Sequence, residues 1–299
     1  MFIDIHAHAY RYQEKFVCGF CNPEQLINKW DELGIAKGVV QPIVSPEVYL
    51  PQSNEDILDM AEKYPDRIIP FCNIDPRALR NMPNSDFGPL MEYYKERGCK
   101  GIGEVMCNLH IMDPRMQNLF HHAEKAGFSV TIDGAVMLDN GFGVYDEPGL
   151  PGYEYTLLSY PDLVVFGHGP VFWSEIAKLD SPAQRGYIYK QYGGRTGGMG
   201  EGPIKEEGQA VRMLRKYPNL YGDLSDGTPH YMLSRDPDFG AALLTEFQDK
   251  MFFGTDIVSP RMPVPIIGLL NDWLKEGRLT QEVYDKITYK NAEKFLGLV

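Results

Sequence analysis

Eight short apolar segments recur along the chain, and amphipathic segments with helix signals lie between most of them. Apolar runs of this length, bounded by glycine and polar residues, are typical of buried parallel strands. The predicted strands span residues 2–8, 38–43, 68–74, 101–105, 128–133, 163–168, 220–224 and 251–256.

Helical periodicity predicts helices between these strands. Asn22 is suited to cap a helix that begins at Pro23, and Gly34 is suited to end it. The other predicted helices span residues 53–64, 85–97, 114–126, 205–216, 239–247, 264–275 and 281–296. This alternation predicts an α/β protein with one closed (β/α)8 barrel, a TIM barrel, over residues 1–299, and a C-terminal helix packed outside it.

The longest irregular stretch, residues 169–203, follows the sixth predicted strand. Long loops usually carry function, and the aromatic and arginine side chains in this one indicate an ordered lid over the barrel mouth. Trp173 and Arg195 are therefore candidate substrate contacts, since an arginine there can bind a substrate carboxylate through two hydrogen bonds. His230, in the loop after the seventh strand, faces the same mouth and is a third candidate.

Composition narrows the class of protein. The formal net charge of −12 argues against a nucleic-acid partner, because phosphate binding requires a basic face. No apolar run approaches the roughly 18 to 20 residues of a membrane span, and the first strand leaves no room for a signal segment. Five cysteines form no disulfide framework, so we expect a cytoplasmic protein with a small-molecule substrate, either a monomer or a homo-oligomer.

His6 and His8 lie two residues apart on the first predicted strand, so both imidazoles project from the same face. Two neutral imidazoles on one face supply half of a site for a borderline metal such as zinc. The alternative is that two histidines merely occur at a strand end. Further ligands elsewhere in the chain decide between these interpretations.

Polar or ionisable residues recur where the predicted strands end, which is the end of a barrel that carries the chemistry in barrel enzymes. Apart from the histidine pair, these residues are Glu104, Asp133, His168, Asp223 and Asp256, on the fourth to eighth strands. A purely structural role would scatter such residues along the strands instead.

With these residues in place, the sequence resembles the amidohydrolase superfamily, and in particular the amidohydrolase-related branch that includes aminocarboxymuconate-semialdehyde decarboxylase. The resemblance covers nearly the whole chain in the expected order. It is carried by Asp4-Ile5-His6-Ala7-His8, Gly103-Glu104, Val165-Phe166-Gly167-His168-Gly169, Tyr221-Gly222-Asp223-Leu224-Ser225 and Phe253-Gly254-Thr255-Asp256.

The resemblance implies a divalent metal, commonly zinc, held by His6, His8 and Asp256. Many members add a histidine on the fifth strand, where this chain has Asp133. Asp133 can take that place as an oxygen ligand, Glu104 can do so as in branches with a fourth-strand glutamate, and His168 is a further candidate. A carboxylate in place of an imidazole also suits harder ions such as manganese or iron.

A divalent cation lowers the pKa of its bound water to about 7 and so provides a nucleophile at neutral pH. Asp256 is suited to take the proton of this water and pass it to the leaving group, and His168 to polarise the scissile carbonyl. We therefore expect a hydrolase that cleaves an amide, ester or lactone of a small polar molecule through a metal-activated water. Asp4 is either a carboxylate that orients a ligand or a buried acid bonded to backbone.

Two other functions are compatible with the same residues. A metal-dependent non-oxidative decarboxylase, a lyase, would use the metal to hold a carboxylic acid and a site acid to protonate the carbon. A barrel that binds a ligand without turnover would explain the departure at Asp133, although His6, His8, His168 and Asp256 are all present.

Overall fold

Eight parallel strands form the centre of the protein, described by a computed structural model over residues 1–11, 19–48, 52–190 and 195–299. They alternate with helices along the chain, as the apolar pattern predicts. The strands are β1 (Phe2–Ala7), β2 (Ile35–Val40), β3 (Ile68–Pro70), β4 (Gly101–Val105), β5 (Ser129–Ala135), β7 (Val165–His168), β10 (Leu220–Asp223) and β11 (Met251–Phe252).

The strands close into a ring. Hydrogen bonding gives two runs of neighbours, β1-β2-β3 and β4-β5-β7-β10-β11. A parallel bridge between Cys72 and Ile102 joins the runs after β3, and a second bridge between Ala7 and Ile257 joins them beside β1. The predicted TIM barrel is therefore confirmed.

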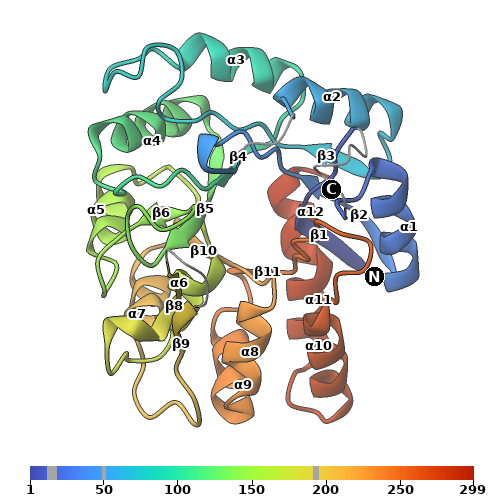
Figure 1. The fold of residues 1–299 in the computed structure, drawn as a ribbon. Helices are drawn as coiled ribbons and strands as arrows, with labels where there is room; N and C mark the ends of the chain where they lie inside the picture. Colours follow the sequence, from blue (N-terminus) through green and yellow to red (C-terminus); the bar gives the residue numbers. More distant parts are fainter. Residues whose placement is uncertain (12–18, 49–51, 191–194) are drawn as a thin grey trace.

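Helices surround the ring of strands (Figure 1). Their starts follow from capping chemistry: the Asn22 side chain accepts from the Gln25 backbone N–H, and the Gln25 side chain accepts from the Asn22 N–H. Among the described residues, no helix is long and apolar enough to cross a membrane. The outer helices are α1 (Pro23–Leu33), α2 (Asn54–Lys63), α3 (Gly88–Glu96), α4 (Pro114–Ala126), α5 (Pro151–Ser159), α7 (Gln209–Lys216), α9 (Pro237–Glu246) and α10 (Pro265–Lys275).

The C-terminal segment is less regular than the single helix predicted over 281–296. It consists of α11 (Gln281–Asp285), a π-helical turn over Lys286–Lys290 and α12 (Asn291–Leu296). Ala292 and Leu296 belong to one buried cluster with Ile3, Ile5 and Phe252. Helix α12 therefore packs directly against the strands β1 and β11.

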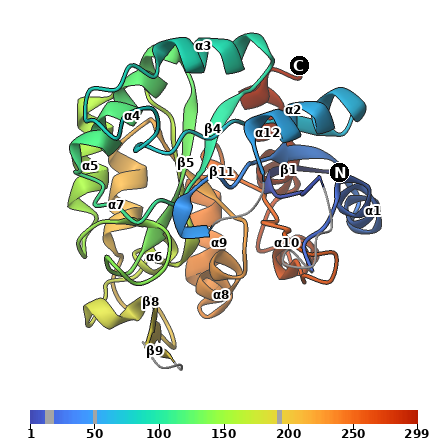
Figure 2. The same ribbon diagram turned by 45° about the horizontal axis from the view of Figure 1, so that its top comes forward.

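The described part of the stretch after β7 contains regular structure that the sequence pattern does not predict. It begins with α6 (Gly169–Ser174) and continues into an antiparallel hairpin of β8 (Arg185–Tyr189) and β9 (Arg195–Met199). The hairpin projects from the body of the molecule (Figure 2). The remaining elements of the described residues are the short strand β6 (Val144–Tyr145), α8 (Thr228–Ser234) and two 3-10 turns, Pro46–Val48 and Pro182–Gln184.

A buried arginine anchors the base of this hairpin. Arg185 is 1% exposed, its Nη1 donates to the carbonyl of Asp146 at 2.7 Å, and its Nε lies 3.1 Å from Glu175 Oε1. Replacing Arg185 by alanine leaves the buried Glu175 carboxylate without its cation, and removing one partner of a buried pair costs about 3–5 kcal/mol. We expect Arg185→Ala to lower the free energy of unfolding by about that amount in urea denaturation.

The matched control is Arg212→Ala, because Arg212 is 57% exposed and contacts the exposed Glu206. A surface ion pair contributes at most about 1 kcal/mol, so this variant should unfold at nearly the wild-type urea concentration. Equal stabilities of the two variants would contradict the anchoring role of Arg185.

Candidate metal centre

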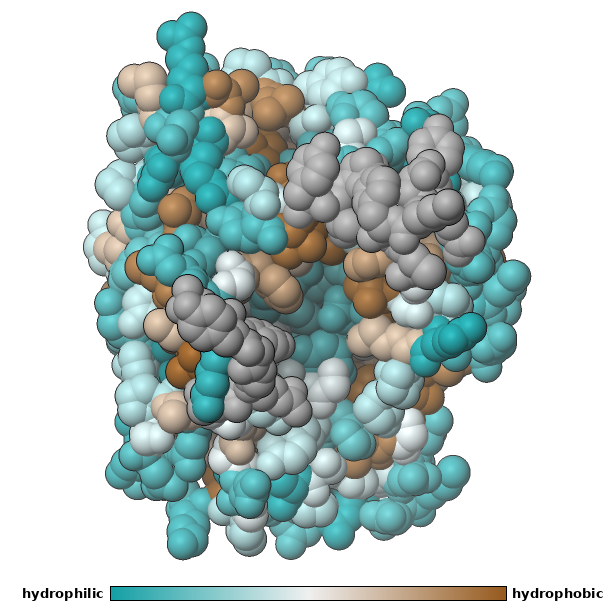
Figure 3. Space-filling view, viewed as in Figure 1, coloured by the Kyte–Doolittle hydropathy of each residue, from teal (hydrophilic) through white to brown (hydrophobic). Residues whose placement is uncertain are grey.

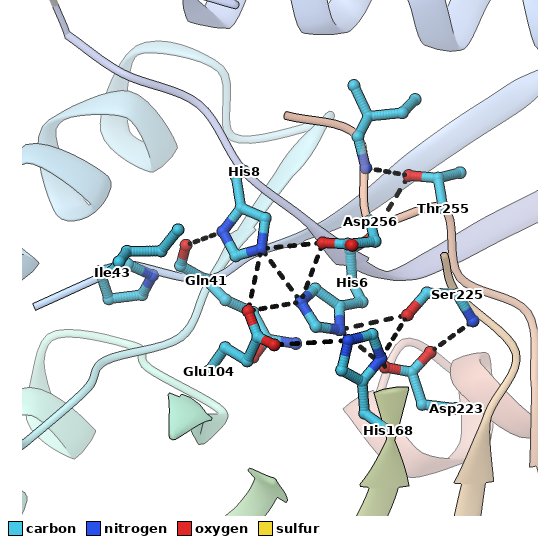
Figure 4. A network of polar contacts seen from close by, with 12 residues as sticks. His6, His8, Gln41, Ile43, Glu104, His168, Asp223, Ser225, Thr255 and Asp256 are labelled. Atoms are coloured by element: carbon cyan, nitrogen blue, oxygen red, sulfur yellow. Dashed lines mark hydrogen bonds and ion pairs between the residues drawn. The ribbon is translucent and has the colours of Figure 1, made fainter. Parts of the chain in front are cut away.

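Four potential ligand atoms converge on one point at the carboxyl ends of the strands (Figure 4). The Nε2 atoms of His6 and His8 lie 3.1 Å apart. Asp256 Oδ1 lies 3.7 and 3.2 Å from these two nitrogens, and Glu104 Oε2 lies 3.5 and 3.4 Å from them. The first, fourth and eighth strands of the ring thus bring together residues that are up to 250 positions apart in sequence.

These separations fit a small divalent ion. Ligand atoms about 2.0 to 2.2 Å from a tetrahedral ion lie roughly 3.3 to 3.6 Å from one another. The five distances that involve a histidine nitrogen range from 3.1 to 3.7 Å. Two imidazole nitrogens and two carboxylate oxygens are also a donor set that zinc accepts, and manganese or iron accept it too.

The other ring nitrogen of each histidine is occupied. His6 Nδ1 lies 2.7 Å from Asp223 Oδ2, and His8 Nδ1 lies 2.8 Å from the Gln41 carbonyl oxygen. A carbonyl oxygen can only accept, so Nδ1 of His8 carries a proton, and in the neutral ring Nε2 is the nitrogen left to bind a metal ion. Partners of this kind fix the tautomer and orientation of metal-binding histidines.

A tight turn after β11 places Asp256. Its backbone N–H donates to the His6 carbonyl at 2.7 Å, and its φ is 54°, in the left-handed region. Gly254 is required on this turn, because a Cβ there would lie 2.6 Å from Asp223 Oδ1 and 2.8 Å from Ser225 Cβ. The predicted eighth strand, 251–256, therefore ends early at Phe252 so that the chain can turn toward the histidines.

Asp4 fastens the ends of two ligand-bearing strands to each other. Its Oδ1 accepts from the backbone N–H groups of His6 and Thr255, at 3.0 and 2.9 Å, and its Oδ2 accepts from Trp30 Nε1. Of the two roles that the sequence allows, the buried acid bonded to backbone is the one observed. Burial raises the pKa of Asp4 to about 7, although these hydrogen bonds oppose the shift.

His168 and Asp133 lie beside the four converging atoms. His168 Nε2 is 3.3 Å from the other oxygen of Glu104, and His168 Nδ1 is 2.9 Å from Ser225 Oγ. Glu104, Asp133 and His168 form a second group of possible ligands that shares Glu104 with the first. Of the residues predicted as a further ligand, Glu104 is therefore the one that joins the two histidines and Asp256.

The buried charges shift the pKa values of these groups. Burial disfavours the charged forms, but the carboxylates of Asp223 and Glu104 outweigh it and hold the pKa of His6 well above its usual value. The pKa of Glu104 is well below its usual range, because hydrogen bonds from His6 and His8 overcome the effect of burial. Burial and the nearby Glu104 charge raise the pKa of Asp133. Glu104 is therefore ionised and ready to bind a cation.

Asp223 orients His6, a role that the sequence did not assign to it. Besides His6, it contacts His168 Nδ1 at 3.3 Å, and its Oδ1 accepts from the Ser225 N–H. Its place at the end of a predicted strand was the available signal. Among the described residues it is the carboxylate that orients His6.

Replacing Asp223 by asparagine should weaken metal affinity by about 10- to 100-fold, the usual effect of losing such an orienting partner. Competition against a chromogenic chelator measures this change. Asp249→Asn is the control, because Asp249 is exposed and pairs with Lys286. An unchanged affinity in Asp223→Asn would show that the His6–Asp223 contact does not support a metal ion.

A cavity of about 390 Å³ opens beside the ligand atoms, within the size range of small-molecule sites. The molecular face of Figure 1 is hollowed near its middle, with hydrophilic residues in the floor and hydrophobic residues on part of the rim (Figure 3). The described residues that line the cavity are His8, Phe20, Ile43, Val48, Glu104, Met106, Asp133, Gly134, Ala135, Val136, Asn140, Gly141, Phe142, His168, Pro170, Tyr187, Asp226, Asp256 and Val258.

Two of the predicted substrate contacts, Trp173 and His230, do not line this cavity. Trp173 is fully buried, and its Nε1 donates to the Asp223 carbonyl at 2.9 Å, so it packs inside the barrel wall. His230 is half-buried and does not line the cavity. The backbone of Arg195 begins β9, but its side chain lies outside the described part of the structure. Tyr187 and Asp226 line the cavity instead.

Comparison with known proteins supports the resemblance. The amidohydrolase family model matches residues 197–298, which include β10 and the loop that carries Asp256. No curated protein matches the chain. The predicted similarity to amidohydrolases is confirmed by the family match and by solved structures of the same fold.

Three solved structures illustrate the similarity. A probable 2-pyrone-4,6-dicarboxylic acid hydrolase from Acinetobacter baumannii, with citric acid bound, has 13% identity, covers 99% of each chain and gives a TM-score of 0.58. A 5-carboxyvanillate decarboxylase from Novosphingobium aromaticivorans, complexed with manganese, has 14% identity and a TM-score of 0.61. The match covers 99% of this chain and 96% of that chain. An amidohydrolase from Burkholderia multivorans with bound zinc has 12% identity, 99% coverage of each chain and a TM-score of 0.58.

Proposed function

We propose that this chain, similar to amidohydrolases in fold and motifs, is a metal-dependent hydrolase of an amide, ester or lactone bond in a small molecule. The observation that carries the proposal is the convergence of His6, His8, Glu104 and Asp256 beside a cavity of small-molecule size. A pair of histidines without a metal role would not need two carboxylates close to its ring nitrogens. A tetrahedral metal site would need them as the third and fourth ligands.

His6, His8, Glu104 and Asp256 would hold the ion, and zinc suits this donor set and spacing best, with manganese and iron as alternatives. A bound divalent cation would lower the pKa of a water molecule bound to it and would polarise a nearby carbonyl group. Zinc- and manganese-bound relatives of the same fold support this choice of ions.

Asp256 is the ligand most open to the cavity, with 22% of its side chain exposed against 5% or less for the other three. It is therefore the residue that takes a proton from water in the cavity and returns it to the leaving group. His168 lines the same cavity and is held by Ser225, so its Nε2 is positioned beside Glu104 to polarise a substrate oxygen.

A decarboxylase is the second candidate. Solved structures of two decarboxylases, of 5-carboxyvanillate and of 2,6-dihydroxybenzoate, share this fold. Asp133, which stands where many relatives have a histidine, lines the cavity with Asp226. A carboxylic acid at either position can protonate the carbon that loses carbon dioxide. A barrel that only binds its ligand is the third candidate.

Removal and return of the metal distinguishes these functions. We expect chelated protein to lose activity and zinc or manganese to restore it, when a panel of lactones, esters, amides and aromatic carboxylic acids is assayed. Acid release without carbon dioxide supports the hydrolase, and carbon dioxide release supports the decarboxylase. Tight binding without turnover in metal-replete protein supports the binding barrel, and full activity of metal-free protein contradicts the proposal.

We further propose a cytoplasmic location, because the described cysteines, Cys21, Cys72, Cys99 and Cys107, are all free and buried. Cell fractionation tests this location. A homo-oligomer stays a prediction that sedimentation can test.

A further inference from the structure

The cavity has an apolar wall made by a small cluster that is separate from the main core. Tyr10, Ile43 and Met106 form this cluster, and Phe20 and Val48 pack against it. Four of these five residues line the cavity, and the ring of the fifth, Tyr10, packs against Phe20. Because the barrel and its helices already share a large continuous core, a separate cluster that faces a cavity is well placed to bind an apolar group.

Two large aromatic side chains stand at the open side of the same cavity. Phe142, in the loop after β5, is 51% exposed, and Tyr187, on β8, is 40% exposed. Val136, Pro170 and Val258 add further apolar surface. Exposed aromatic side chains that gather around a cavity are typical of binding sites, because a ligand removes them from water.

The charged residues around the cavity are acidic. Four carboxylates line it, those of Glu104, Asp133, Asp226 and Asp256, and none of its described lining residues is lysine or arginine. A divalent ion would balance Glu104 and Asp256. A substrate carboxylate beyond the ion would then lie next to Asp133 and Asp226, with no described lysine or arginine side chain among the lining residues to pair with it.

From the apolar wall, the exposed aromatics and the acidic lining, we propose that the substrate carries an uncharged apolar group of about the size of an aromatic ring. This group packs against Met106, Phe142 and Tyr187 while the reacting bond lies beside His168 and Asp256. The inference rests on the proposed metal centre and adds the substrate class. It differs from the small polar substrate expected from the sequence, and the contact expected from Arg195, whose side chain lies outside the described part of the structure, stays a prediction.

Three hydroxamates test this assignment, because the hydroxamate group binds divalent metal ions and the remainder of each molecule probes the cavity. Isothermal titration calorimetry of zinc-loaded protein should show that benzohydroxamate binds about 10-fold more tightly than acetohydroxamate. The reason is that burial of an aromatic ring contributes at least a tenfold gain in affinity. We expect 4-carboxybenzohydroxamate, which differs from benzohydroxamate by one carboxylate, to bind about 10-fold more weakly than benzohydroxamate.

A variant locates the apolar contact. Phe142→Ala should weaken benzohydroxamate binding about 5- to 10-fold and leave acetohydroxamate binding unchanged, whereas Phe142→Leu should retain most of the affinity. Leu158→Ala, a change of a 61% exposed apolar residue on α5, is the matched control.

Equal affinities for benzohydroxamate and acetohydroxamate would overturn the inference while leaving the metal centre in place. Tighter binding of the carboxylated analogue would overturn it in the same way. If none of the three hydroxamates binds zinc-loaded protein better than metal-free protein, the metal centre itself is wrong, and the inference falls with it.

Discussion

Protein in which His6 and His8 are both replaced by alanine is expected to contain almost no divalent metal after purification and to have no measurable turnover. The pair supplies two of the four converging ligand atoms, and the two carboxylates that remain cannot form a tetrahedral site alone. Elemental analysis should show a fall from about one ion per chain to nearly none.

The matched control replaces two adjacent histidines outside the site, His121 and His122 on α4. This variant should keep its metal and its activity. Because His6 and His8 are buried, thermal unfolding of the apo wild-type protein must be compared with that of the His6→Ala/His8→Ala variant. If the variant folds and still binds one ion per chain, the metal centre lies elsewhere.

Asp256→Asn is expected to reduce kcat by about 100- to 10,000-fold, the range for loss of a general acid–base. The amide has the same shape as the carboxylate but cannot accept a proton at neutral pH. Metal content should be measured on the same sample, so that loss of proton transfer is distinguished from loss of the ion. The backbone N–H of residue 256 would still donate to the His6 carbonyl, and the fold should therefore persist.

Asp272→Asn serves as the comparison, because Asp272 is an exposed aspartate on α10. It should retain wild-type kcat. Undiminished turnover in metal-replete Asp256→Asn protein would remove Asp256 from the mechanism.

The barrel was predictable from sequence because most strand residues are buried, so the strands appear as short, largely apolar segments between helical patterns. Helix α5 was not predicted, because its apolar residues do not form a single face. Tyr153 and Leu157 are buried, whereas Tyr155 and Leu158, which are also apolar, are exposed. Tertiary packing, not local pattern, forms this helix.

The ligand set was predictable as far as position along a strand determines it. His6, His8, Glu104 and Asp256 all lie at or just after strand ends, which meet at one end of a barrel. Which strand-end residues face each other depends on register and on turns such as the one at Gly254.

Contacts across the barrel were not predictable. The orientation of His6 depends on Asp223, 217 residues away in sequence. The burial of Trp173 was not predictable, because a tryptophan in a long loop can either face the mouth or pack inward, and here its indole N–H reaches the Asp223 carbonyl. Phe142 and Tyr187 came together only through the fold of the loops that follow β5 and β7.

The most direct test of the metal centre is anomalous diffraction, at the absorption edge of the metal found by elemental analysis, from crystals of protein purified without chelator. We predict one strong peak bonded to His6 Nε2, His8 Nε2, Glu104 and Asp256, at about 2.0–2.2 Å from each ligand atom. A metal-replete crystal with no peak between these four residues would contradict the proposed centre.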